Sequence, residues 1–305
     1  MESRIASGPL RLARDAAVEW YEDNTFRLAA SLAFYTIFSL APLLLIAIAV
    51  AGLVFGEEVA TRQLLRQIEG LVGPEGAAAV RDVVTSASRS PQSTGAALLG
   101  IATLVVGSTA VFAELQAALN FIWGVQPKPT RGAIVGLILS RVTAFAVVLG
   151  VGFLLLVSLV ASAVLAAAQE YLAENVLAMP EIWRVANVVV SFALTTGLFM
   201  LIYKVLPDVR LRWTDVAVGA AVTALLFTIG KFLIGEYLGR ISVGSRYGAA
   251  GSFAVLLVWI YYSALISFYG AEFTHVYYRR RHGARVAPEP HAEPAELPPT
   301  GAGSP

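Results

Sequence analysis

Long apolar stretches alternate with short charged intervals along this chain. Six runs are long enough to cross the hydrocarbon core of a membrane, which takes about 20 helical residues at 1.5 Å each. These runs extend approximately over residues 28–55, 95–121, 133–168, 183–206, 214–234 and 249–277. Charge is confined to the intervals, whereas a soluble protein would scatter it over every surface helix. The pattern predicts an all-α membrane protein with six transmembrane helices.

The intervals divide the chain into parts with different expected roles. Residues 1–27 form an N-terminal segment whose amphipathic stretch, 10–21, is expected to lie along the membrane surface. The transmembrane domain follows over 28–278, and 279–305 is expected to be a disordered tail rich in Pro, Ala and Glu. Apolar residues alternate with charges in the insert 57–94. We expect this insert to form a small extracytoplasmic cap of amphipathic helices, broken at Gly73-Pro74.

The amino-acid composition excludes several classes of function. The chain is 57% hydrophobic and 14% charged, with a mean hydropathy of +0.70. It has no Cys, which excludes disulfides and thiolate chemistry, and its three His lie at or beyond the end of the last apolar run. The membrane body therefore lacks imidazole for a metal site or a general base. We expect no metal, no cofactor and no enzymatic activity. No phosphate-binding loop for ATP is present, and a net charge of +1 gives no field for nucleic acid.

The distribution of Lys and Arg predicts the orientation in the membrane. Fourteen of the 22 fall in the two termini and the alternate intervals that share their side, and eight fall on the other side. Positive residues are retained on the cytoplasmic side of short loops. Both termini are therefore expected in the cytoplasm.

A polar stripe marks the first apolar run. Arg27, Ser31, Tyr35 and Ser39 recur every four residues, which places them on one helix face, and Pro42 then interrupts the backbone hydrogen bonding. Such a stripe either lines a substrate path or packs against a neighbouring helix, and packing is the more common role.

Glu114 is the most informative ionisable residue inside the apolar runs. It is followed by Asn120 and should lie about two turns from the cytoplasmic boundary, at a depth similar to that of Arg141. A pair between Glu114 and either Arg141 or Arg27 would satisfy both charges. A purely structural ion pair and a place on a substrate path are both open readings.

The sixth run carries aromatic and acidic candidates. Trp259 lies in mid-run rather than in an interfacial belt, so it either lines a cavity or packs in the core. Ser263, Ser267 and Ala271 form a ridge of small residues suited to a neighbouring helix. Glu272 lies near the inner boundary, where water or a cytoplasmic Arg would balance its charge.

Three stretches resemble the YihY/BrkB family of bacterial inner-membrane proteins, once labelled ribonuclease BN. They are RLAASLAFYTIFSLAP at 27–42, ELQAALNFIWG at 114–124, and 247–272 with its WIYYS and GAE elements. The resemblance covers most of residues 20–280. It implies a location in the bacterial inner membrane and links to envelope biology and serum resistance, but no agreed molecular activity. The ribonuclease label finds no support, because the chain lacks a paired-carboxylate, metal or basic-aromatic constellation for RNA.

Three functions follow from these patterns. The leading hypothesis is translocation of an amphipathic or lipid-like envelope substrate along a polar cluster on several spans. The second is a membrane scaffold that does not transport, in which the same polar residues pair internally. An intramembrane enzyme is the weakest, because Glu114 has no second carboxylate or nucleophile nearby. Membrane lipids are the expected partners, with envelope proteins or further copies of the chain as alternatives. The cluster consists of Arg27, Tyr35, Ser39, Glu114, Asn120, Arg141, Trp259 and Glu272.

Overall fold

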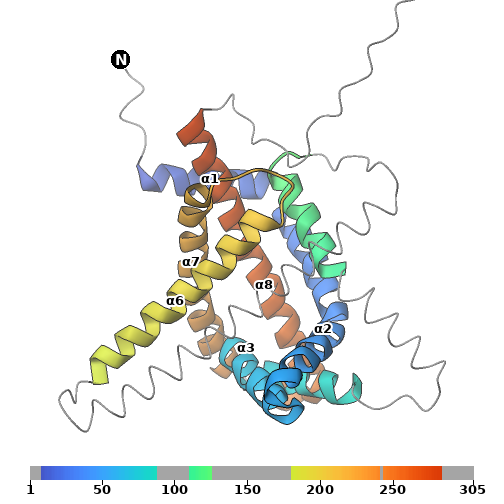
Figure 1. Ribbon diagram of the computed structural model, residues 1–305. Coiled ribbons are helices and arrows are strands. Elements are labelled where there is room, and N and C mark those ends of the chain that lie inside the picture. The colour runs from blue at the N-terminus through green and yellow to red at the C-terminus, as the bar shows by residue number, and fades with distance from the viewer. Residues whose placement is uncertain (1–7, 88–109, 126–179, 241–242, 284–305) are drawn as a thin grey trace, which may run out of the picture.

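A computed structural model describes residues 8–87, 110–125, 180–240 and 243–283. This part of the chain is helical and contains no β-strand, which confirms the predicted all-α class. Helix α1 lies across one end of the molecule and α3 across the opposite end, while α2, α6, α7 and α8 run between them (Figure 1). The helices are α1 (Pro9–Glu22), α2 (Thr25–Phe55), α3 (Glu57–Ala87), α6 (Pro180–Val205), α7 (Trp213–Arg240) and α8 (Val243–His282), with a shorter helix over 110–122.

Three segments of the described chain are long and apolar enough to cross a membrane. They are Val185–Val205 in α6, Trp213–Leu233 in α7 and Phe253–His282 in α8. These segments coincide with the fourth, fifth and sixth predicted runs. Shorter apolar stretches, Thr25–Leu40 and Ala110–Ile122, fall in the first and second runs. The third run and much of the second lie outside the described residues, so the count of six stays a prediction.

A tight turn separates α1 from α2 and lets the chain change direction between them. Asn24 adopts the left-handed conformation, with φ 52° and ψ 40°, which Asn tolerates better than most residues. The hydroxyl of Thr25 donates a hydrogen bond of 2.6 Å to the carbonyl of Trp20. Pro9 begins α1, where its missing N–H has no helical partner to lose. Helix α1 is thereby set apart from the long α2 and lies against a different helix, α8.

Helix α3 is continuous through Gly73 and Pro74, so the predicted break at this dipeptide is wrong. Proline removes one backbone hydrogen bond, but side chains on both sides of it hold the helix in place. Leu64, Leu65 and Ile68 before the dipeptide, and Val80 and Val84 after it, pack in the same cluster with α2 and α8. Gly56, with φ 82°, makes the turn from α2 into α3.

Helices α7 and α8 approach each other closely at two glycines. A Cβ added to Gly219 would overlap the hydroxyl of Thr274, and one added to Gly270 would overlap the hydroxyl of Thr223. Each glycine thus contacts the threonine of the other helix. Within each helix, the glycine precedes the threonine by four residues. The two threonine hydroxyls donate to the carbonyls of Gly219 and Gly270 in their own helices, each at 2.7 Å. Small residues allow this close packing, which lipid-facing helices need because apolar burial between them gains little.

Tyr203 adds α6 to this contact. Its fully buried hydroxyl donates 2.6 Å to the carbonyl of Ser267 and lies 3.0 Å from the Thr223 hydroxyl. In membrane proteins, a buried polar group can form its hydrogen bonds with a neighbouring helix in place of water. The hydroxyl of Tyr203 therefore connects α6 to both α7 and α8.

Replacing Gly270 with Ala tests this junction. The added methyl group would overlap Thr223 and lie 2.6 Å from the Tyr203 hydroxyl, so α7 and α8 must separate. We expect the free energy of unfolding to fall by about 1–3 kcal/mol, as for other overpacked cores, measured by thermal unfolding in detergent. The matched control is Gly8→Ala, where nothing lies within 4 Å. An unchanged unfolding temperature for Gly270→Ala would contradict the packing described.

Candidate functional site

The contact between α1 and the C-terminal end of α8 brings together residues that are far apart in the sequence. Ala16 of α1 is buried against Phe273 and Val276 of α8. The Trp20 indole donates 3.1 Å to the carbonyl of Leu265, and the Tyr269 hydroxyl donates 3.0 Å to that of Ala13. Part of the apolar face that the sequence assigned to the membrane surface is thus used to dock α1 on α8.

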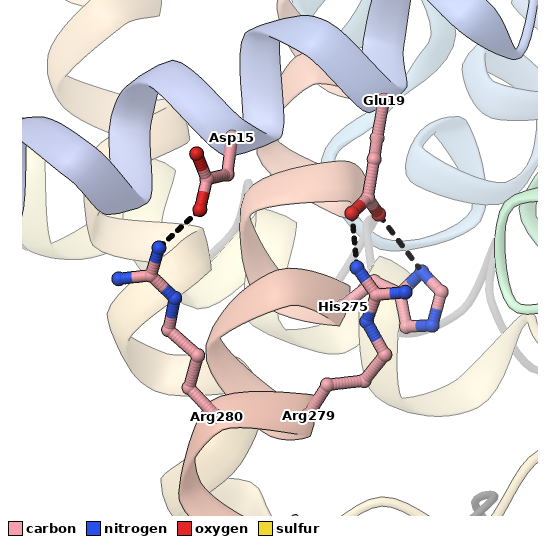
Figure 2. A network of polar contacts seen from close by, with 5 residues as sticks. All are labelled: Asp15, Glu19, His275, Arg279 and Arg280. Atoms are coloured by element: carbon pink, nitrogen blue, oxygen red, sulfur yellow. Dashed lines mark hydrogen bonds and ion pairs between the residues drawn. The ribbon is translucent and has the colours of Figure 1, made fainter. Parts of the chain in front are cut away.

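Acidic residues one turn apart on α1 face the basic end of α8. Asp15 pairs with Arg280 and Glu19 pairs with Arg279, as Figure 2 shows. The Nδ1 atom of His275 lies 3.9 Å from Oε2 of the same Glu19. Glu19 therefore uses one carboxylate oxygen for the guanidinium group and turns the other toward the imidazole.

The next arginine of α8 binds α7 instead. Arg281 lies 3.1 Å from Oδ1 of Asp215, whose side chain is fully buried in the first turn of α7. Consecutive arginines thus fasten the end of α8 to two different helices. In the sequence, these arginines indicate only which side of the membrane the C-terminal end occupies.

Glu272 lies about two helical turns before this arginine cluster and is completely buried. Its exposed fraction is 0%, and neither carboxylate oxygen has a hydrogen-bond partner in the structure. Its charged neighbours are the carboxylates of Asp23 and Glu19 and the guanidinium group of Arg279. An ionised carboxylate in such a place costs several kcal/mol unless a proton, a cation or a donor compensates it.

An open groove of about 760 Å³ runs between α1 and the end of α8. Val18 and Val276 contribute apolar surface to it. Its basic lining residues are Arg14, Arg279 and Arg280, and its acidic ones are Asp15, Glu19 and Glu22. The groove can accept a group that carries both an anionic part and an apolar part.

Asn120, a predicted member of the polar cluster, has a structural partner. Its Nδ2 donates 2.7 Å to Oδ2 of Asp208, and its Oδ1 accepts 2.8 Å from the Asp208 backbone N–H. Gln116 donates 3.2 Å to the other oxygen of Asp208. The 110–122 helix is thereby fixed to the turn between α6 and α7. Asp208 lies in a short charged interval, and nothing in the sequence pattern signalled it.

The remaining predicted site residues lie in several places. Arg27 and Tyr35 are exposed on α2, whereas Ser39 is buried. Glu114 is half-buried on the 110–122 helix, and the described residues contain no ion pair between it and Arg27.

Two further residues of the predicted set are Trp259 and Arg141. Trp259 is buried in the core of α8, with its ring centroid 5.8 Å from that of Phe227. Arg141 lies outside the described residues. Of the predicted residues that the structure describes, Glu272 alone belongs to the site between α1 and α8.

Comparison with known proteins identifies the family to which this sequence is similar. The sequence model of a family described as "Virulence factor BrkB" matches residues 16–296. A "UPF0761 membrane protein" of Alcanivorax borkumensis is 27% identical over 276 residues, which are 90% of this chain and 62% of the relative. One of Xanthomonas campestris is 29% identical over 267 residues, 82% of this chain and 56% of the relative. The chain thus spans about three fifths of the length of these relatives. No solved structure matches it.

Replacing Asp208 with Ala tests the role of Asn120. The amide of Asn120 is 4% exposed, so the loss of its carboxylate partner leaves a buried donor unpaired. We expect the free energy of unfolding to fall by about 1–3 kcal/mol, measured by thermal unfolding in detergent. Asp82→Ala, at an exposed position of α3, is the control and should leave stability unchanged. Equal stability of the two variants would show that Asn120 does not depend on this contact.

Proposed function

The chain belongs to the BrkB family of membrane proteins, and from that premise we propose that it moves an amphipathic, lipid-like envelope substrate across the bacterial inner membrane. In this proposal both termini lie in the cytoplasm, as the Lys and Arg distribution predicts. The substrate then meets the protein at the groove between α1 and α8, at the cytoplasmic surface of the bilayer.

The observation that carries the proposal is the mixed character of this groove. Arg14 and Arg280 supply guanidinium groups, which bind phosphate and carboxylate head groups through paired N–H donors. Val18 lines the same groove and is 45% exposed, and Leu10 on the same helix is 84% exposed. An amphipathic helix of this kind lies at the boundary between head groups and acyl chains. A lipid-like molecule offers the complementary anionic head and apolar tail.

Within the membrane, the proposed path follows the polar residues predicted from the sequence. Arg27 and Tyr35 present exposed side chains on α2, and Glu114 is half-buried. A carboxylate at this depth serves either as a proton-linked site or as the partner of a cation. Coupling to an ion gradient or to a partner protein replaces ATP in this proposal, because the chain has no phosphate-binding loop.

A membrane scaffold without transport is the second candidate. It is favoured by the internal pairing of Asn120 and Gln116 with Asp208, since these polar groups hold the fold together rather than face a substrate. In that case the groove would recruit envelope proteins or a further copy of the chain instead of a lipid.

Lipid movement in liposomes distinguishes the two. Purified protein should move a fluorescent anionic phospholipid between leaflets, measured by dithionite quenching with and without a proton gradient. The double variant Arg14→Gln/Arg280→Gln removes two head-group donors from the groove, so we expect its initial rate to fall by at least about tenfold. Arg66→Gln, on α3 at the other end of the molecule, is the matched control.

Two results would count against transport. One is the absence of movement by the wild-type protein with several anionic and zwitterionic lipids. The other is equal rates for the double variant and the control when both are folded, as judged by their unfolding temperatures. The first result would favour the scaffold, and the second would remove the groove from the path.

A further inference from the structure

Three potential metal ligands meet beneath the groove. Glu19 comes from α1, and Glu272 and His275 come from α8. One ligand atom from each lies within 4.8 Å of the others. Ligands at about 2.0–2.2 Å from a tetrahedral ion lie roughly 3.3–3.6 Å apart, so side-chain shifts of about 1 Å would bring all three into coordination.

The buried carboxylate of Glu272 lacks a hydrogen-bond partner among the described residues. Both of its oxygens are buried without a hydrogen-bond partner. Among its charged neighbours, the carboxylates of Glu19 and Asp23 face a single guanidinium group, that of Arg279. When all three carboxylates are ionised, their charge exceeds that of Arg279 by two. A divalent cation supplies that amount of charge.

Two of the three ligands, Glu19 and His275, are held in a suitable orientation. Glu19 gives one oxygen to Arg279 and keeps Oε2, which is 3.9 Å from His275 Nδ1, directed into the cluster (Figure 2). Arg279 then acts as an outer partner that orients the carboxylate, as is common around bound metals. The His275 ring lies against the Trp123 ring, with centroids 5.0 Å apart. Packing by Trp123 limits the rotation of the imidazole.

We propose that Glu19, Glu272 and His275 bind a divalent transition-metal cation. A set of two carboxylates and one imidazole suits Zn²⁺ or Mn²⁺ better than Ca²⁺ or Mg²⁺, which prefer oxygen ligands alone. Asp23 is the other acidic neighbour of Glu272. The cation joins α1 to α8, and its effect is to hold α1 in its docked position. This inference does not rest on lipid transport, because its test measures metal and stability alone.

The direct test uses full-length protein, purified in detergent through a tag without histidine. After chelator treatment and dialysis, Zn²⁺ and Mn²⁺ are titrated separately, and bound metal is counted by mass spectrometry. We expect one ion per chain and a metal-dependent rise in the unfolding temperature. Glu272→Gln and His275→Gln should each weaken binding by more than about 100-fold, since loss of a second-shell partner alone costs about 10–100-fold.

Two control variants resemble these changes but leave the cluster intact. His282→Gln removes the other imidazole at the end of α8, and Glu22→Gln removes a neighbouring carboxylate of α1. Both should bind metal as the wild type does. Glu272→Gln has nearly the same shape and removes a buried charge, so without metal it should be at least as stable as the wild type.

Three outcomes would overturn the proposal. The wild type could bind neither ion, Glu272→Gln could bind as tightly as the wild type, or the controls could weaken binding as much as the ligand variants. The first outcome, combined with equal unfolding temperatures for Glu272→Gln and the wild type, would indicate that a proton rather than a metal neutralises Glu272.

Discussion

The close contact of α7 with α8 is the constraint on which the rest of the described structure depends. Two glycines and two threonines bring the helix backbones together, and Tyr203 adds α6 to the same level. In a membrane, packing and hydrogen bonds between helices have to replace the hydrophobic effect that drives soluble folding. Because this contact fixes the position of α8 along its axis, it also fixes what each end of α8 can reach.

Helix α8 is long enough to contact other helices at both ends of the molecule. Its 40 residues extend about 60 Å, roughly twice the hydrocarbon thickness of a bilayer. Near one end, Leu256 packs with α2 and α3 in a separate apolar cluster. At the other end, Arg279, Arg280 and Arg281 each bind a carboxylate of α1 or α7. The candidate site is therefore the terminus of a rigid element rather than a loop.

The sequence predicted what depends on local pattern and missed what depends on distant partners. Apolar run length gave the all-α class and the last three spans, and the small-residue ridge of the sixth run coincides with the tight contact, where Ala271 is fully buried. The pairing of Asp15 and Glu19 was not predicted, because their arginine partners are some 260 residues away. For the same reason Glu272 was expected to be solvated or paired with a cytoplasmic Arg. It is buried instead, between carboxylates that the local pattern could not place beside it.

The wide separation of α1 from α8 in the sequence also sets the order in which the protein can be built. Glu19 and Arg279 are separated by 260 residues, so at about 5–20 residues per second α1 leaves the ribosome roughly 13–50 s before its partner exists. During that time Asp15 and Glu19 have only water or lipid head groups to contact. Docking of α1 thus comes late in assembly, and it can occur only in a chain that has been made and inserted through α8.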